Sequence, residues 1–233
     1  MLNTQQCIAY FALLEQVKYP RTAISYNQAL IKVATVDLLP SDEINEAAYD
    51  LPEVPAYNYI FEYYDYGSTF LTSNSGAMLW FVWIHLALMI FILIARLFKF
   101  KMQRLSKYIY WNALLRLYME SIFELTLLAT LNVIKADWSS QNFSEQFSNY
   151  LSLLVIILAF VGPLGILMFY YRRIEEWNDE DFNNRFGEIL VGLRTQQITR
   201  GKRWTLLIYP MLFFLRRLLF VAITFFMADF LTG

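Results

Sequence analysis

The sequence predicts an all-α integral membrane protein: a polytopic bundle of about four transmembrane helices that follows a small extracytosolic N-terminal segment. Hydrophobic residues make up 58% of its 233 residues and charged residues only 17%, whereas soluble domains average about 45–50% and about 25%. The apolar residues gather in blocks of about 20, the length that a helix needs to cross about 30 Å of hydrocarbon. We therefore expect the lipid bilayer as the main partner, and a division into residues 1–75 and a transmembrane domain over residues 76–233.

The N-terminal segment is acidic, with nine acidic residues against three basic ones among residues 1–75. Its pattern predicts two short helices, roughly Thr4–Lys18 and Ser25–Leu39, each followed closely by a proline. From Asp50 to Ser75 the chain is rich in proline, tyrosine, asparagine and glycine, which predicts packed loop. The first 20 residues lack the pattern of a secretory signal.

The first predicted span covers residues 76–97, because its core carries no formal charge and Arg96 stands at its far end. Trp80 and Trp83 lie near its other end, where interfacial aromatic residues are common. His85, the sole histidine, lies inside this span. We expect a packed, neutral imidazole, because a proton or ligand role needs a partner that the sequence does not identify.

The second predicted span, residues 108–134, contains four polar residues spaced by four: Asn112, Arg116, Glu120 and Glu124. Each step of four turns a helix by only about 40°, so these side chains share one face. Ionisable groups at membrane depth are functional candidates by default. The stripe is either an interhelical ion-pair network that fixes packing or the lining of a path for an ion or small polar solute. Glu124, out of reach of Arg116, needs a cation, a proton or a basic residue of another helix.

The third predicted span, residues 150–171, is uncharged and contains Gly162, Pro163 and Gly165. Pro163 removes one backbone hydrogen bond and is expected to kink the helix. The small residues around it are expected to let a neighbouring helix approach closely. Pro163 is therefore a candidate packing residue.

The fourth predicted span, residues 206–231, carries the pair Arg216 and Arg217. Because the pair lies near the inner end of the helix, we expect snorkelling to the headgroups rather than pairing with the glutamates of the second span. Both arginines are candidate coupling or packing residues.

The distribution of basic residues predicts the orientation. Lys and Arg are concentrated in and beside the loops 98–107 and 172–204, whereas the loop 135–149 contains only Lys135. By the positive-inside rule, residues 1–75 and 135–149 face the extracellular or lumenal side of a membrane that the sequence does not specify. The sequence Asn142-Phe143-Ser144 falls in that outer loop, which makes Asn142 a candidate glycosylation site.

The inner loop before the fourth span has an apolar stripe. Phe186, Ile189, Leu190 and Leu193 recur at helical spacing and predict a short amphipathic helix. It either lies flat on the inner leaflet or packs against the undersides of the spans.

The sequence offers little for catalysis. It contains one histidine, one cysteine, no glycine-rich phosphate loop and no metal-ligand cluster. We expect no enzyme activity, no catalytic or metal site and no cofactor. A net charge of −1 gives no indication of a nucleic-acid partner.

Three stretches carry motifs that occur together in one known family. They are RFGEILVGLRTQQITRGKRWTLLIYPMLFFLRRLLFVAITFF, NALLRLYMESIFELTLLATLN, and LLPSDEINEAAYDL followed by YDYGSTFLTSNSGAML. Together they resemble TRP-like membrane proteins, which include the fungal flavin-carrier type and the large cysteine-rich multipass proteins of ciliates. The resemblance covers most of the chain.

The resemblance implies part of the membrane domain of an ion channel or transporter, with cation transport as one activity. It implies structural or coupling roles for Arg116, Glu120, Arg216 and Arg217. The chain is then expected to be a fragment, whose partners are further helices of the full-length protein or an oligomer. The alternatives are a non-transporting accessory or structural subunit of a larger membrane complex, and the membrane anchor of a receptor-like ectodomain.

Overall fold

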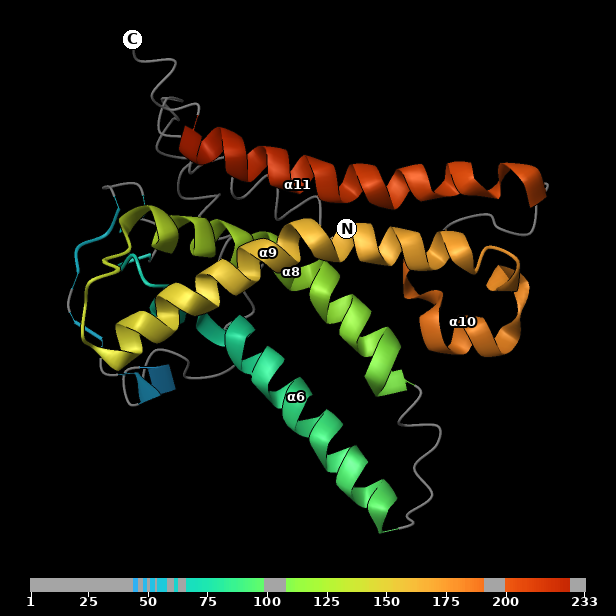
Figure 1. Ribbon diagram of the computed structural model, residues 1–233, viewed down its shortest axis with the longest axis horizontal. Helices are drawn as coiled ribbons and strands as arrows, with labels where there is room; N and C mark the ends of the chain where they lie inside the picture. The colour runs from blue at the N-terminus through green and yellow to red at the C-terminus, as the bar shows by residue number, and fades with distance from the viewer. Residues whose placement is uncertain are drawn as a thin grey trace, which may run out of the picture. The chain divides into compact units, whose positions relative to one another are not determined.

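The computed structural model describes residues 66–98, 108–190 and 200–226, with short pieces between residues 44 and 62 (44–45, 48–49, 51–52, 54–57 and 61–62). The described residues contain helices and no strand, which confirms the predicted all-α class (Figure 1). The two helices expected before residue 40 lie outside the described residues. In the described part of the expected loop from Asp50 to Ser75, residues 61–62 are helical and α5 (Leu71–Asn74) is a short helix.

Four helical stretches are long and apolar enough to cross a membrane, as expected of an integral multi-pass membrane protein. The first is α6 (Gly76–Leu97), with the bounds that the sequence predicted. The second begins as a π-helix, η2 (Tyr108–Ala113), and continues as α8 (Leu114–Lys135). The third is α9 (Phe143–Arg172), which begins seven residues before the expected start at residue 150.

The fourth stretch consists of a 3-10 helix, η6 (Arg200–Leu207), and α11 (Ile208–Phe226). Residues 227–231, which the sequence assigned to this span, lie outside the described residues. Between α9 and η6 the chain forms three short helices: η3 (Glu176–Asn178), α10 (Glu180–Phe186) and η4 (Gly187–Leu190).

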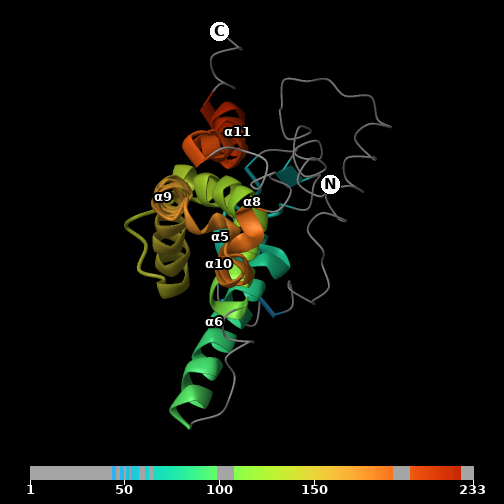
Figure 2. The ribbon, with the colours of Figure 1, turned by 90° about the vertical axis from the view of Figure 1, so that its right-hand side faces the viewer.

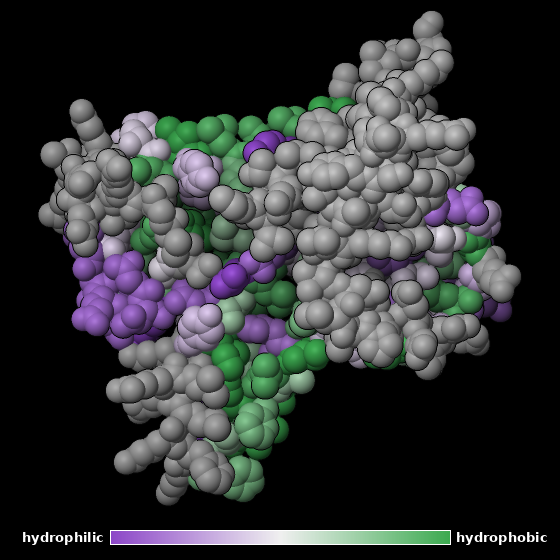
Figure 3. Space-filling model, turned by 180° about the vertical axis from the view of Figure 1, so that it is seen from behind, coloured by the Kyte–Doolittle hydropathy of each residue, from purple (hydrophilic) through white to green (hydrophobic). Residues whose placement is uncertain are grey.

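The long helices expose many large apolar side chains, as helices surrounded by lipid do. On α6, Ile90 and Phe91 are more than half exposed, and on α9 the same holds for Phe160 and Leu164. Figure 3 shows apolar residues over the described surface of α6. By contrast, α8 is the most buried of the four spans, and Ser121–Ala129 is buried on every side. Of the polar stripe, this buried stretch contains Glu124.

The chain forms two compact units. The first contains Met1–Trp80, Phe123–Ile157 and Arg217–Gly233. Within it, the rings of Tyr57, Phe61 and Phe225 form an aromatic cluster with centroid separations of 5.5–6.0 Å. The N-terminal segment therefore packs with residues of the spans.

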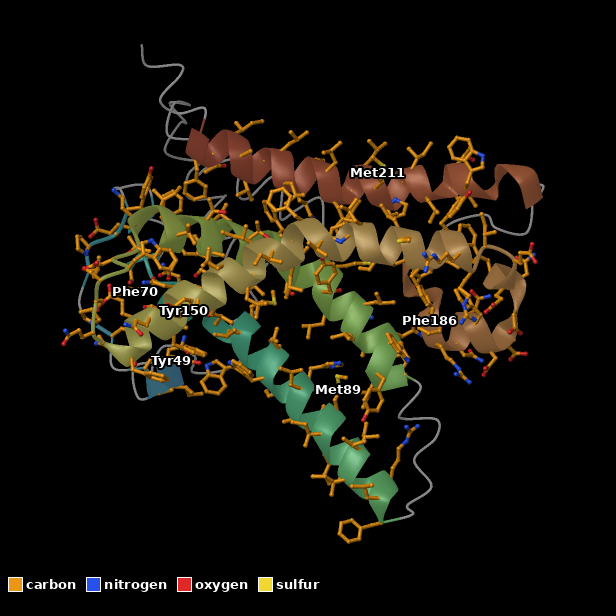
Figure 4. All side chains as sticks on the ribbon, viewed as in Figure 1. Tyr49, Phe70, Met89, Tyr150, Phe186 and Met211 are labelled. Atoms are coloured by element: carbon orange, nitrogen blue, oxygen red, sulfur yellow. The ribbon has the colours of Figure 1, made fainter. Side chains whose placement is uncertain are left out.

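The second unit contains Phe81–Ile122 and Leu158–Arg216. Its core gathers the end of α9, the short helices and η6 around Trp177, which is fully buried. Figures 1 and 2 both show α10 beside the beginning of the second span, and Figure 4 shows Phe186 among other side chains there. The ring of Phe186 lies 5.2 Å from that of Trp111.

This core decides between the two interpretations of the amphipathic stripe. Ile189 and Leu190 are buried in the core of the second unit with Tyr170, Trp177, Phe182 and Leu207. These two side chains of the stripe therefore pack against the protein rather than facing the inner leaflet. Leu193, the last residue of the predicted stripe, lies outside the described residues.

The close approach expected near Pro163 occurs at one glycine only. A Cβ atom at Gly162 would lie 2.8 Å from Cζ of Tyr118, whereas a Cβ at Gly165 would meet nothing within 4 Å among the described atoms. The Tyr118 hydroxyl donates to the carbonyl of Leu158 at 2.9 Å, one turn before Gly162. Pro163 itself is buried inside α9. The expectation for Gly165 was therefore wrong, because that residue lies on an exposed face of the helix.

Candidate functional site

The four polar residues of the second span have different surroundings, although they lie along one face. Asn112 and Glu124 are buried, whereas Arg116 is exposed and Glu120 is partly exposed. Their spacing of four along the helix did not distinguish these residues. Only the packing of neighbouring elements shows which of them are buried.

Asn112 acts as an anchor for the short helix α10. Its Nδ2 donates to the backbone carbonyl of Asn184 at 2.9 Å. That bond satisfies a donor that would otherwise be buried without a partner at considerable cost. The contact supports a packing role for Asn112 within the second unit.

Arg116 and Glu120 form an ion pair on α8. The Arg116 Nε lies 3.1 Å from Glu120 Oε1, and the side chains are 56% and 45% exposed. The pair agrees with the expectation that Arg116 neutralises the next residue of the stripe. An exposed pair of this kind contributes only about 0.3–0.5 kcal/mol to helix stability.

A shallow, largely open cavity of about 270 Å³ borders this ion pair. It lies within the second unit, between α6 and the start of the second span. Nine residues line it: Phe81, Ile84, His85, Leu88, Tyr108, Ala113, Arg116, Leu117 and Glu120. The cavity therefore combines an apolar wall with the Arg116–Glu120 pair, the imidazole of His85 and the phenol of Tyr108.

His85 is the third ionisable group of the cavity and is 9% exposed. Its imidazole makes a hydrogen bond with the backbone of Ile109. Its Nε2 is buried and makes no hydrogen bond within the described part of the chain. The expected packed position is confirmed, but His85 also presents an unused polar atom in a residue that lines the cavity.

Glu124 and Arg217 are buried at a contact between α8 and α11 in the first unit. Glu124 is 3% exposed and Arg217 is 2% exposed. The guanidinium carbon of Arg217 lies 5.7 Å from the ring centroid of Phe123, the residue before Glu124. The Phe123 ring packs edge-on against Phe220 at 5.5 Å. A basic residue of another helix therefore lies beside the segment that contains Glu124.

The burial of Arg217 corrects the expectation for the arginine pair. Arg217 is enclosed rather than extended to a headgroup region, because its face of α11 packs on α8 at Phe123. Arg216, turned by about 100° on the same helix, is exposed. Snorkelling therefore remains a prediction for Arg216 alone.

The loop between α8 and α9 presents the candidate glycosylation site. Asn142 is exposed and caps α9, because its Oδ1 accepts the backbone N–H of Ser144 at 2.9 Å. In the same loop, the hydroxyl and N–H of Ser139 donate to Asp137. These two bonds lower the pKa of the Asp137 carboxyl below its ordinary value.

A buried polar junction in the first unit was not predicted. Its centre is Asn132, whose Oδ1 accepts from the Leu71 N–H at 2.8 Å and from the Ser148 hydroxyl at 2.7 Å. Its Nδ2 donates to Oδ1 of Asn149 at 2.6 Å. One sequence signal could have indicated this junction. Asn132 is a single asparagine in the apolar run that ends the second span, opposite Ser148 and Asn149.

Comparison of the chain with protein-family models, with curated proteins and with solved structures finds no match. Among the described residues, no group of three or more His, Cys, Asp and Glu side chains is placed to hold a metal ion.

Proposed function

We propose that this chain is part of the membrane domain of an ion channel or transporter of the TRP-like kind that its sequence resembles. The observation that supports it is the Arg116–Glu120 pair, about half exposed in the span that is the most buried of the four. A charge facing hydrocarbon costs about 2.5–3.5 kcal/mol at the centre of a helix. The open face is therefore expected to meet water, an ion or another polar group.

The test is cation flux through liposomes that contain the purified chain, with Glu120→Gln as the variant. Because the exposed pair contributes little to stability, we expect the variant to keep its helical content and melting temperature while its flux changes several-fold. Glu180→Gln, which removes an exposed carboxylate on α10, is the matched control. Equal flux through wild type, Glu120→Gln and protein-free liposomes would contradict a transport role.

A second candidate function is a non-transporting accessory subunit of a larger membrane complex. The burial of both Glu124 and Arg217 favours it, because the deepest charges of the bundle are enclosed by packing. This function predicts no cation flux above that of protein-free liposomes, and a loss of stability when either charge is removed. The two candidates thus differ in the flux of the wild-type chain.

The orientation proposed with this function places residues 1–75 and 135–149 on the extracellular or lumenal side. The support is the excess of Lys and Arg in and beside the loops 98–107 and 172–204.

A further inference from the structure

The cavity beside the ion pair is formed by two matching helix faces. Each face contributes residues at positions i, i+3, i+4 and i+7, the spacing of one helical stripe. The stripe of α6 is Phe81, Ile84, His85 and Leu88, and that of the second span is Ala113, Arg116, Leu117 and Glu120. His85 on α6, Arg116 and Glu120 on α8, and Tyr108 at the start of the second span therefore border a common space with apolar side chains between them.

The polar groups of the cavity complement a zwitterion. The Arg116 guanidinium is a fork of donors suited to phosphate or carboxylate oxygens. The Glu120 carboxylate accepts hydrogen bonds and carries the opposite charge. The Nε2 atom of His85 is buried and is not counted among these groups. A ligand with an anion beside an N–H-bearing cation would match Arg116 and Glu120.

The surroundings of the cavity indicate a membrane lipid as the source of that zwitterion. Ile84 and Leu88, which line the cavity, are 45% and 43% exposed, so an apolar surface continues to the lipid side. The volume of about 270 Å³ lies just below the range of about 300–1,000 Å³ of drug-sized pockets. It suits a headgroup whose acyl chains remain outside, against the exposed apolar residues.

We propose that this cavity binds the headgroup of a phospholipid with a primary ammonium, such as phosphatidylethanolamine. Arg116 binds the phosphate, and Glu120 accepts from the ammonium. This inference rests on the proposed function because it uses the same Arg116–Glu120 site, and it identifies a ligand of that site. Choline has no N–H to donate, so the site discriminates against phosphatidylcholine.

The experiment uses the full chain, delipidated in detergent and analysed by native mass spectrometry. The probes are short-chain phosphatidylethanolamine, short-chain phosphatidylcholine and free phosphoethanolamine. We expect the ethanolamine lipid to bind at least about tenfold more tightly than the choline lipid, the factor that corresponds to about 1.4 kcal/mol. Free phosphoethanolamine, which lacks acyl chains, is expected to bind more weakly than the ethanolamine lipid.

Two variants locate the binding. Glu120→Gln should reduce the preference for ethanolamine over choline to about threefold or less, whereas Glu180→Gln should leave it unchanged. Ile84→Trp, at an exposed position, fills the cavity and should weaken the binding of both lipids. Each variant is compared with wild type by its thermal unfolding, so that a lost preference is assigned only to folded protein.

Equal binding of the two lipids by wild type, or an unchanged preference in Glu120→Gln, would overturn the proposal. If free phosphoethanolamine binds as tightly as the lipid, the ligand is a soluble zwitterion and not a lipid. Flux through liposomes separates this inference from the proposed function. Lipid binding without cation flux would contradict the transport function but support the lipid ligand. Cation flux without a lipid preference would contradict the lipid ligand but support the transport function.

Discussion

The side-chain oxygen of Asn132 accepts the backbone N–H of Leu71 at 2.8 Å, and both residues are almost completely buried. Leu71 is the first residue of α5, so its N–H belongs to a helix terminus that has no acceptor within the helix. Asn132 lies near the end of α8 and supplies that acceptor from 61 residues along the chain. The bond ties the lead-in of the first span to the second span within the first unit.

The first prediction concerns this junction. Asn132→Ala removes the partner of three hydrogen-bonding groups at once, on Leu71, Ser148 and Asn149. Because a buried group without a partner costs about 1–3 kcal/mol, we expect a loss of about 2–4 kcal/mol in the free energy of unfolding. Chemical or thermal unfolding in detergent measures it. Thr130→Ala, which removes a hydroxyl bonded within α8, is the control, and equal losses would show that the junction contributes nothing special.

The second prediction concerns the two glycines of α9. Gly162→Ala would place a methyl group against Tyr118, and such overpacking costs about 1–3 kcal/mol. Gly165→Ala meets open space, and alanine is the better helix former by about 0.8–1.0 kcal/mol. We therefore expect a lower melting temperature for the first variant and an equal or higher one for the second.

A double variant tests the cause of the first effect. In a Tyr118→Leu background the ring is absent, so Gly162→Ala should cost clearly less than it does in wild type. The same cost in both backgrounds would mean that Tyr118 is not what Gly162 accommodates.

The third prediction concerns the candidate glycosylation site. If the loop between α8 and α9 is lumenal, Asn142 carries one glycan in a eukaryotic membrane, seen as a mobility shift that an endoglycosidase reverses. Asn142→Asp and Ser144→Ala should both abolish the shift. Asp is as good a helix cap as Asn, and Ser144→Ala keeps the Asn142 cap, so both variants should unfold within about 0.5 kcal/mol of wild type.

The fourth prediction concerns orientation and uses a background in which Cys7 is replaced by serine. A cysteine introduced at Ser140, in the loop between α8 and α9, should react with an impermeant reagent from the extracellular or lumenal side. A cysteine at Asn178, exposed between α9 and α10, should react only after permeabilisation. The reverse pattern would invert the proposed topology.

Local features of the sequence predicted the spans well, because length and hydropathy are properties of a segment alone. The start of α9 at Phe143 was missed, since it depends on the Asn142 cap and not on hydrophobicity. Gly162 and Gly165 look equivalent in the sequence, but only one faces Tyr118. Arg216 and Arg217 are likewise neighbours in the sequence, but only Arg217 is buried. The helix face that contacts a neighbouring helix is set by residues far apart in the sequence. The pattern within one span therefore does not reveal that face.

The last prediction concerns Glu124 and Arg217. Both are buried, they carry opposite charges, and Arg217 lies over the ring of Phe123. We expect their energies to be coupled across α8 and α11. Removing one charge of a buried pair costs about 3–5 kcal/mol because the other charge is left uncompensated. Glu124→Gln and Arg217→Gln should therefore each destabilise the chain by an amount of this order.

The double variant Glu124→Gln/Arg217→Gln should lose less than the sum of the two single losses, by about 0.5–3 kcal/mol, because neither charge is then left buried without the other. Arg216→Gln is the control: its side chain is exposed, so we expect a change within about 0.5 kcal/mol. Cation flux is measured on the same preparations. Lost stability with unchanged flux assigns Glu124 to packing, whereas altered flux with full stability would place Glu124 on the transport path and leave the coupling without support.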